Sequence, residues 1–394
     1  STPLYSSAAS DVYKRQIQNM DIDIPLTRFV CISGVSGSGK STLMNNALYQ
    51  SLVSERGRIA EDPAAIESIH CDAEPVEIVL VDQAPISRTP RSNPAVFVDA
   101  WDEIRKLFGK LPEAGAQGYT ASSFSFNAGD GRCEHCKGLG YEKVEMQFLS
   151  DVFVPCPHCN GRRFKNELLD IRFLNHSISD LLELTIEQSI QIFKEYPKIY
   201  DKLLALSQIG LGYLKLGQPL NTLSGGESQR LKLVKYLRVN TSTKRRASNS
   251  SNLDSGSSLI LLDEPTTGLH KHDVKRLLAA LQQIVDHGNS LIVIEHNLDV
   301  LKSADWIVEL GPEAGSNGGR LVFQGSPAAC AASGQTETGK YLAREFNSNQ
   351  PLLAAENRGS YEASQTNGNS QRELHMLGAR EHNLKNIDES IPHY

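Results

Sequence analysis

Short apolar runs of strand length recur along this chain, and turn residues or segments of helical periodicity separate them. From Asp273 to His287 the apolar residues recur at helical spacing, and Gly288 marks the end of that helix. Another helix is expected to begin near Lys40. Strands that alternate with helices favour a parallel sheet covered by helices, so the pattern predicts an α/β fold. The predicted strands are Val30 to Ser33, Val76 to Val81, Leu259 to Leu262, Leu291 to Ile294 and Trp306 to Leu310.

The alternation of strands and helices stops between residues 84 and 213. This stretch contains paired cysteines, a glycine-rich region that suits a hairpin, and then several helical segments. Two further stretches, 241–258 and 347–371, are polar and poor in apolar residues, which favours disorder. We therefore expect one α/β core that is interrupted by an inserted region.

Composition places the chain among globular proteins that do not cross a membrane. Of its 394 residues 40% are hydrophobic and 22% are charged. No apolar run approaches the roughly 18–20 residues that a membrane helix needs, and no secretory signal is recognisable. We therefore expect a cytoplasmic protein. The net charge of -6 argues against a generally basic nucleic-acid coat, although local patches determine such binding.

The run GVSGSGKS, which begins at Gly34, fits the pattern GxxxxGK[ST] and lies between a predicted strand and a predicted helix. In such a loop the glycines let backbone N–H groups face phosphates, while Lys40 supplies positive charge and Ser41 offers a hydroxyl to Mg²⁺. The N-terminal end of the following helix adds to this field. A glycine-serine loop that matches by accident is the alternative, and this context disfavours it. The predicted nucleotide-binding residues are Gly34, Ser36, Gly37, Ser38, Gly39, Lys40, Ser41 and Thr42.

Two acidic residues, Asp263 and Glu264, follow the buried strand that begins at Leu259. We expect Asp263 to hold Mg²⁺, directly or through water, and Glu264 to orient and deprotonate an attacking water. An acidic pair in this place is sometimes only a helix cap, but the phosphate-binding loop favours the catalytic interpretation. ATP with Mg²⁺ is therefore the predicted ligand.

The run LSGGE at residues 223–227, followed by Gln229 and Arg230, resembles the signature motif of the ABC ATPase family. The resemblance implies that Ser224, Gly225 and Gly226 bind the γ-phosphate of ATP held by an opposite module. It also implies that two modules pair head to tail with two ATP molecules between them. ATP binding would clamp the pair and hydrolysis would release it.

Two further residues fit the same resemblance. Gln83, after the second predicted strand, is similar to the Q-loop glutamine of ABC ATPases. His296, after the strand that ends at Ile294, is similar to the switch histidine, which contacts the γ-phosphate. We therefore expect Glu264, His296 and Gln83 to be the catalytic residues.

Four of the seven cysteines fall in two CxxC pairs, which residues 137–155 separate. This spacing is typical of a four-thiolate zinc site, and the intervening segment can form a hairpin. A redox role is the alternative for such pairs. His135 and His158 lie inside the pairs and are left out of the ligand set, because four thiolates saturate a tetrahedral site. The predicted zinc ligands are Cys133, Cys136, Cys156 and Cys159.

Basic and aromatic residues surround the cysteines, among them Arg132, Lys143, Phe153 and Arg162. Such a mixture suits a nucleic-acid surface, but it equally suits a solvated face on a small metal-stapled fold. Local composition alone leaves these two interpretations open.

An ABC ATPase with a CxxC…CxxC module between Gln83 and the signature is similar to the UvrA family, the damage-sensing subunit of excinuclease ABC. The segments 88–94 (RTPRSNP), 210–219 and 294–299 (IEHNLD) are also similar to that family, and the resemblance covers roughly residues 17–345. It implies an ATPase that recognises DNA damage in nucleotide excision repair, as part of the SOS response, without being the nuclease. The implied partners are damaged double-stranded DNA, a UvrB-like protein, a second ATPase module in the same chain and a second copy in a homodimer.

Two other functions are considered beside repair. A UvrA-like protein with another task, such as drug self-resistance, would share every motif described above. An ABC transporter subunit is disfavoured by the cysteine module and by the lack of a membrane-spanning run. The short interval between Lys40 and Gln83 resembles the second of the two UvrA modules.

The motifs define expected boundaries along the chain. We expect the ATP-binding core at residues 17–83 and 214–345, with the inserted region at 84–213 and its zinc module at about 125–165. Residues 1–16 are expected to be a non-native or junction segment, and 346–372 a linker. The nine residues from Ile17 (IQNMDIDIP) resemble those from Leu384 (LKNIDESIP). Residues 373–394 are therefore expected to be the start of a further, truncated module.

Overall fold

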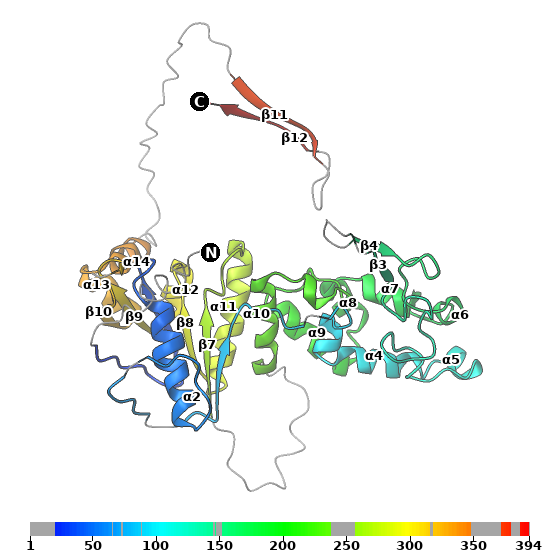
Figure 1. Ribbon diagram of the computed structural model, residues 1–394, viewed down its shortest axis with the longest axis horizontal. Coiled ribbons are helices and arrows are strands. Elements are labelled where there is room, and N and C mark those ends of the chain that lie inside the picture. The colour runs from blue at the N-terminus through cyan, green and yellow to red at the C-terminus, as the bar shows by residue number, and fades with distance from the viewer. Residues whose placement is uncertain are drawn as a thin grey trace, which may run out of the picture. The chain divides into compact units, whose positions relative to one another are not determined.

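A six-stranded sheet flanked by helices organises the larger part of the molecule (Figure 1). The computed structural model describes residues 20–64, 66–71, 74–87, 89–144, 146, 152–237, 257–315 and 318–347, and the backbone of 372–379 and 387–393. Residues 1–347 form one compact unit and 348–394 a second. The predictions for residues 1–16 and Arg88, and most of those for 241–258 and 346–372, fall outside the described residues.

The sheet has the strand order β10-β9-β1-β8-β7-β2. All five predicted strands are present and pair in parallel: β1 (Phe29–Gly34), β2 (Glu77–Val81), β7 (Ser258–Asp263), β8 (Ser290–Ile294) and β9 (Trp306–Gly311). The sequence did not predict β10 (Arg320–Gly325), which pairs with β9 in the antiparallel direction and makes the sheet mixed. An antiparallel neighbour needs only a short connection, whereas the parallel strands need crossovers.

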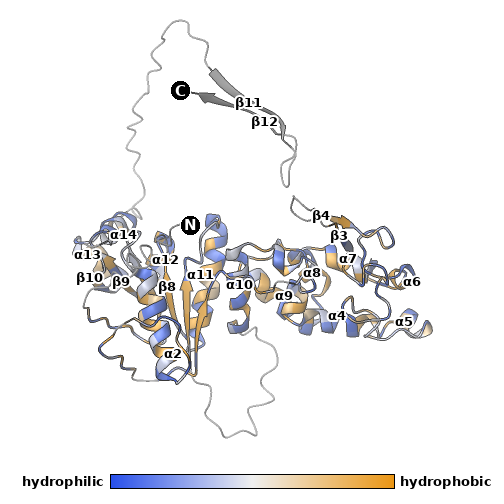
Figure 2. Ribbon diagram, viewed as in Figure 1, coloured by the Kyte–Doolittle hydropathy of each residue, from blue (hydrophilic) through white to orange (hydrophobic). Residues whose placement is uncertain are grey.

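Helices cover both faces of this sheet. On one face η1 (Thr42–Gln50), a π-helix, continues into α2 (Ser51–Glu55), and its Leu43 and Met44 pack on inward side chains of the strands. The other face carries α11 (Lys271–Asp286), which confirms the predicted helix. Its buried residues face the sheet, and Figure 2 shows hydrophobic strands between helices that are hydrophilic outside.

The inserted region combines short helices with hairpins and turns, and it shares the core cluster that lies under α11. Buried aromatic rings pack together in it, as Phe108 does on Phe124 and Phe126 does on Phe164. Capping boxes at Ser177 and Thr185 begin two of its helices. The helices are α3 (Pro94–Phe97), α4 (Ala100–Phe108), α5 (Pro112–Ala116), α6 (Asn166–Leu169), α7 (Ile178–Glu183), α8 (Ile186–Ile192) and α9 (Pro197–Gln208). The hairpins are β3 (Tyr141–Val144) with β4 (Val152–Pro155), and β5 (Arg172–Phe173) with β6 (His176–Ser177).

The chain returns from the inserted region to the sheet through η2 (Leu220–Thr222), α10 (Gly225–Leu233) and η3 (Val234–Tyr236). Between β8 and β9 lies α12 (Leu298–Ser303), and after β10 come α13 (Pro327–Ser333) and α14 (Glu337–Asn347). None of the helices in the described part of the chain has both the length and the apolar character that a membrane crossing requires.

The second unit contains two antiparallel strands, β11 (Arg372–Ala379) and β12 (Ile387–His393). The later copy of the repeated nine-residue sequence thus falls largely within a strand. Residues 20–25 of the earlier copy form no regular element. The expectation that 373–394 begin a further module stays a prediction.

Candidate nucleotide site and metal centre

The carboxyl ends of parallel strands converge on one edge of the sheet, where ligands of open α/β sheets usually bind. Four strands end at this edge. β1 leads into the glycine loop, and Gln83, Glu264 and His296 follow the ends of β2, β7 and β8. A cavity of about 400 Å³ lies at this edge. It is lined by Ser41, Asn45, Leu80, Asp82, Gln83, Asp263 and Glu264.

The glycine loop has a backbone that other residues would strain. Gly34, Gly37 and Gly39 have φ angles of 135°, 78° and 95°, in the region that favours glycine. A Cβ atom at Gly34 would lie only 2.0 Å from the carbonyl oxygen of Leu310. The glycines of the GxxxxGK[ST] motif are therefore required here for steric reasons. The loop leads directly into η1.

Lys40 lies across this loop rather than pointing into solvent. Its side chain is largely buried, and Nζ donates to the carbonyl oxygens of Gly34 (3.0 Å) and Val35 (2.8 Å). Burial lowers the pKa of Lys40, while the negative charges of Glu264 and Asp263 oppose that shift. The ammonium group is thus held beside the two carboxylates that end β7.

Ser41 and Asp263 bring two oxygen donors together, with Ser41 Oγ 3.5 Å from Asp263 Oδ2. Burial, followed by the charge of Glu264, raises the pKa of Asp263. A hydroxyl and a carboxylate are the hard oxygen ligands that Mg²⁺ prefers. The donor set present at this edge therefore fits a magnesium ion bound with phosphates.

Glu264 adopts a left-handed backbone, with φ of 44°, which is uncommon for a residue other than glycine. Its Oε1 lies 3.6 Å from His296 Nε2, so the side chains that follow β7 and β8 face each other. Such strain persists only where surrounding contacts over-determine it, and it clusters at functional sites. Glu264 and His296 therefore form a structurally defined pair at the cavity edge.

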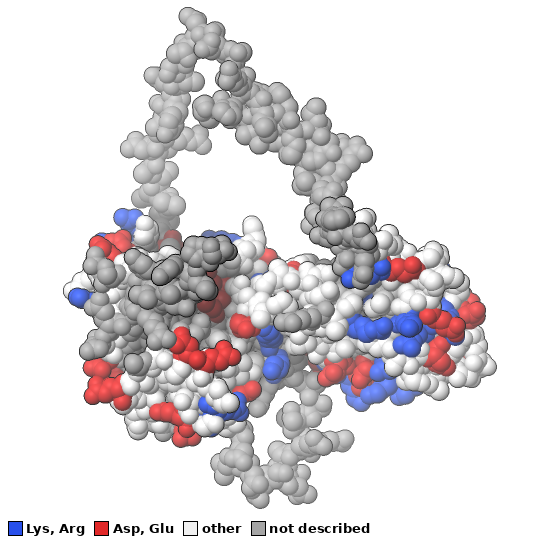
Figure 3. All heavy atoms as spheres, in the orientation of Figure 1, with Lys and Arg blue, Asp and Glu red and all other residues white. Residues whose placement is uncertain are grey.

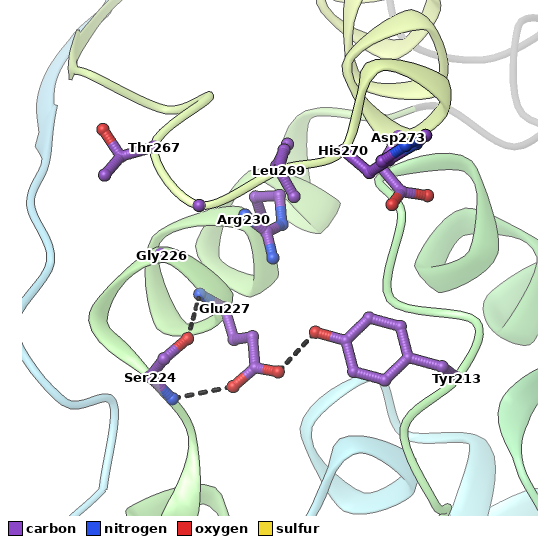
Figure 4. Close-up of a pocket in the computed structure, with 10 residues that line it drawn as sticks. Tyr213, Ser224, Gly226, Glu227, Arg230, Thr267, Leu269, His270 and Asp273 are labelled. Atoms are coloured by element: carbon purple, nitrogen blue, oxygen red, sulfur yellow. Dashed lines mark hydrogen bonds between the residues drawn. The ribbon is translucent and has the colours of Figure 1, made fainter. Parts of the chain in front are cut away.

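The signature residues line a different pocket, of about 600 Å³ (Figure 4). Ser224 caps α10, accepting at Oγ from the Glu227 N–H (3.3 Å), while Glu227 accepts from the Ser224 N–H (2.7 Å) and from the Tyr213 hydroxyl. The opposite wall is formed by Thr267 to His270, the segment after β7. Ser224 and Gly226 thus do not line the cavity that Ser41 and Asp263 share.

Gln83 lies between the cavity and the start of the signature helix. It lines the cavity, and a Cβ atom added to Gly225 would lie 3.1 Å from its Cβ and Oε1 atoms. The first helical residue of α10 therefore has to be small if Gln83 is to keep this position.

The four predicted cysteine ligands come together at the base of the β3–β4 hairpin. All four are buried, their sulfur atoms lie within 4.8 Å of one another, and Cys136 Sγ is 3.7 Å from Cys159 Sγ. Burial raises the pKa of the Cys136 and Cys159 thiols, that of Cys159 to about 12. Four converging thiols in a closed pocket fit a structural zinc ion, whose charge would favour the thiolates.

The backbone around the cysteines also fits a pair of metal knuckles. Gly138, Gly140 and Gly161 have positive φ angles of 81°, 83° and 81°. The Gly140 N–H points at Cys136 Sγ, at 3.2 Å. The predicted hairpin over residues 137–155 is present as β3 and β4.

His135 and His158 lie beside the cysteine cluster rather than inside it. Their rings are tilted by 40° with centroids 4.1 Å apart, and His135 Nε2 is 2.9 Å from Glu142 Oε1. His135, Glu142 and Cys156 also bring their ligand atoms within 4.8 Å of one another. Four buried thiols nevertheless remain the better-matched ligand set for a tetrahedral ion.

Several residues that line or support these two pockets were not predicted to belong to them. Asn45 and Asp82 line the cavity, and Tyr213 holds Glu227. Gln229 is fully buried, and its Nε2 donates to the carbonyl oxygens of Val81 (3.0 Å) and Asp263 (2.9 Å). The only sequence signal for Gln229 was its place two residues after the signature run.

The α/β fold, the glycine loop and the signature define an ABC-type ATPase module, and the family model described as ABC transporter matches residues 17–128. The chain is 46% identical over 337 residues to UvrABC system protein A of Clostridium tetani, covering 86% of this chain and 34% of that protein. It is 47% identical over 329 residues to UvrABC system protein A of Aquifex aeolicus, covering 84% and 34%.

A solved structure agrees with these sequence relatives. The crystal structure of UvrA2 from Deinococcus radiodurans matches with a TM-score of 0.71 and 42% identity, over 84% of this chain and 38% of that one. The chain belongs to the UvrA family. It spans about a third of the length of the relatives it matches.

Proposed function

We propose that this chain is the ATP-hydrolysing module of a UvrA-type protein that recognises DNA damage in nucleotide excision repair. The observation that carries the proposal is the convergence of Ser41, Gln83, Asp263 and Glu264 on one cavity, beside Lys40 and His296. The relatives named UvrABC system protein A support the repair assignment over the self-resistance alternative. The placement of the module in the cytoplasm is part of this proposal.

Each residue of the site receives a role from its position. Backbone N–H groups of the loop from Gly34 to Thr42, with Lys40, bind the β- and γ-phosphates. Ser41 and Asp263 hold Mg²⁺, which when bound neutralises phosphate charge. Glu264 orients the attacking water and accepts its proton, and His296 donates to the γ-phosphate. Gln83 lies where it can sense the occupied cavity.

The signature requires a second module. Ser224, Gly225 and Gly226 begin α10, and the positive end of a helix attracts anions. Because Ser224 and Gly226 line a pocket apart from the Ser41 cavity, we infer that they cover ATP bound by an opposing module. That module belongs either to the same protein or to a second copy, and ATP binding holds the two together.

The inserted region is proposed to contact DNA. Cys133, Cys136, Cys156 and Cys159 hold a structural zinc ion that fixes the two knuckles and the hairpin between them. Residues 1–347 form one unit, and Figure 3 shows Lys and Arg groups interspersed with acidic groups on the half of it that contains the inserted region. Such groups can contact phosphates without a basic chain overall. Damaged duplex DNA and a UvrB-like protein are the proposed partners.

Substitution of Lys40 by alanine tests the nucleotide assignment. Removing the ammonium group should lower ATP turnover by about 100-fold or more, the range seen when one preorganised charge-stabilising group is lost. Steady-state phosphate release, measured over a range of protein concentrations, reports this loss. Lys340→Ala, which removes an exposed ammonium paired with Glu337, serves as the control and should leave turnover unchanged. Wild-type turnover in Lys40→Ala would overturn the site assignment.

A further inference from the structure

Glu295 is a buried carboxylate at the end of β8 with only 2% of its surface exposed. It does not line the 400 Å³ cavity. Oε1 accepts from the Thr266 N–H (2.9 Å) and the Thr266 hydroxyl (2.6 Å). Oε2 accepts from the N–H groups of His296 (3.0 Å) and Asn297 (3.2 Å). Four donors thus satisfy one buried acidic group.

The two carboxylate oxygens serve two different loops. Oε1 holds the segment that follows β7, two residues beyond Glu264, while Oε2 holds the segment that follows β8 and begins with His296. A backbone hydrogen bond from the Glu264 N–H to the Ile294 carbonyl (3.0 Å) adds a second link between the same strand ends. Glu295 therefore fixes the separation between the residues that carry Glu264 and His296.

This link explains how the strained backbone of Glu264 is maintained. With φ of 44°, Glu264 needs surrounding contacts that define its turn. The Thr267 N–H donates back to the Glu264 carbonyl (3.2 Å), and the adjacent Thr266 is held by Glu295. In the resulting turn after β7, Glu264 Oε1 lies 3.6 Å from His296 Nε2.

We propose that Glu295 is the positioning residue of the hydrolytic pair: it sets the distance between Glu264 and His296 without touching nucleotide. The proposal rests on the ATPase function proposed above. Glu295 acts through Thr266 on one side and through the His296 backbone on the other. Its N–H donates to the Ile32 carbonyl of β1 (3.2 Å), but its carboxylate bonds to the two loops that carry the pair and does not line the cavity. Its removal should therefore affect the chemical step more than nucleotide binding.

The test is Glu295→Gln in the complete chain, which preserves size but replaces one acceptor oxygen by an NH₂ group. One of the two loops then loses its acceptor and faces a donor instead. We expect kcat for ATP hydrolysis to fall at least about 10-fold while KM changes less than about threefold, the signature of an interaction needed in the transition state. Affinity for a fluorescent ATP analogue should stay near that of the unsubstituted chain.

Two further variants separate positioning from folding. Thr266→Val removes the hydroxyl donor but keeps the backbone donor, and should lower kcat by a smaller factor than Glu295→Gln. Glu309→Gln changes another buried carboxylate, in β9, which accepts from the Thr338 N–H (3.3 Å) and makes no contact with the Thr266 or His296 segments among those the structure gives. This variant should leave the ratio of kcat to KM unchanged. An equal loss in Glu309→Gln would show a general effect of buried charge and would overturn the proposal.

The results also distinguish a failure of the proposed ATPase function from a failure of the positioning role of Glu295. If the unsubstituted protein, assembled so that an opposing module can pair with this one, turns over no ATP at any concentration tested, the proposed ATPase is contradicted. Turnover in the unsubstituted chain that Glu295→Gln leaves intact contradicts the positioning role alone. If Glu295→Gln weakens analogue binding and kcat in parallel, Glu295 supports the whole nucleotide site, and the positioning role is wrong.

Discussion

Gln229 shows how one buried side chain connects two motifs that lie far apart in the sequence. Its amide donates to the carbonyl oxygens of Val81, at the end of β2, and Asp263, at the end of β7. Both carbonyls would lose a hydrogen-bond partner if the amide were removed, since the side chain has no exposed surface. Gln229 therefore holds the signature helix against the strand that carries Asp263.

Gln229→Leu is expected to destabilise the chain and the nucleotide site together. Leucine keeps the approximate size but leaves carbonyl oxygens unpaired, which costs about 1–3 kcal/mol for a buried polar group. Urea unfolding should show this loss, and ATP turnover should fall with it. The control Gln282→Leu changes an exposed glutamine of α11 and should shift stability by less than about 0.5 kcal/mol. Equal stability of Gln229→Leu and the unsubstituted chain would refute this role.

Local motifs allowed the residues of the proposed site to be named from the sequence, whereas the residues that hold them in place were not named. The residues from Gly34 to Ser41 are adjacent in the sequence. The pattern that predicts the loop therefore also contains the glycines that its backbone requires. Glu295 and Gln229 derive their roles from partners that only the folded sheet brings near. No periodicity marks a glutamate that receives four hydrogen bonds across two loops.

Among whole elements, the central strands were predictable because each is a short apolar run buried on both faces. β10 was missed, since its side chains are mostly half-buried and no buried apolar run marks it, although it pairs with β9 in the antiparallel direction. The knuckles and hairpin followed directly from cysteine spacing. The individual helices of the inserted region were expected only as a group, because their packing depends on aromatic contacts distant in sequence.

The module that contains the four cysteines is physically tied to the segment that leads into the signature helix. Cys133 donates its N–H to the Arg163 carbonyl (2.8 Å), and the Arg163 guanidinium donates to the carbonyl of Gly217 (2.9 Å). The same guanidinium lies 5.4 Å from the centre of the Phe126 ring. Order in the cysteine cluster is therefore transmitted to residues shortly before Ser224.

Cys133→Ser should reduce zinc binding and loosen this segment. A serine hydroxyl is a poor replacement for a zinc thiolate, so metal analysis should find less zinc per chain than in the unsubstituted protein. Backbone amides between Gly217 and Ser224 should exchange faster with solvent, because Arg163 loses its support. Cys330→Ser alters a buried cysteine outside the cluster and should keep the zinc content. Unchanged zinc stoichiometry in Cys133→Ser would exclude the four-thiolate site.

At the scale of the molecule, the chain contains one set of ATPase motifs and spans about a third of its relatives' length. The separation of the signature pocket from the Ser41 cavity agrees with a site shared between modules. The fold and family could be derived from the sequence, because their motifs are local and specific. The pairing of modules could be expected only from the resemblance, since no pattern within one chain encodes its partner's surface.

The proposed repair function makes its sharpest prediction about DNA. Contacts to phosphates are the same for intact and damaged duplexes, so they contribute equal, salt-dependent affinity to both. A lesion changes how easily the duplex is deformed, and a damage sensor converts that difference into affinity. At matched salt we expect a lesion-bearing duplex to bind about 10-fold more tightly than an intact duplex of the same sequence, with similar salt slopes. Fluorescence anisotropy with ATP present, in the assembled protein, measures both quantities. Equal affinity for the two duplexes would contradict damage recognition and favour another task for this UvrA-family ATPase.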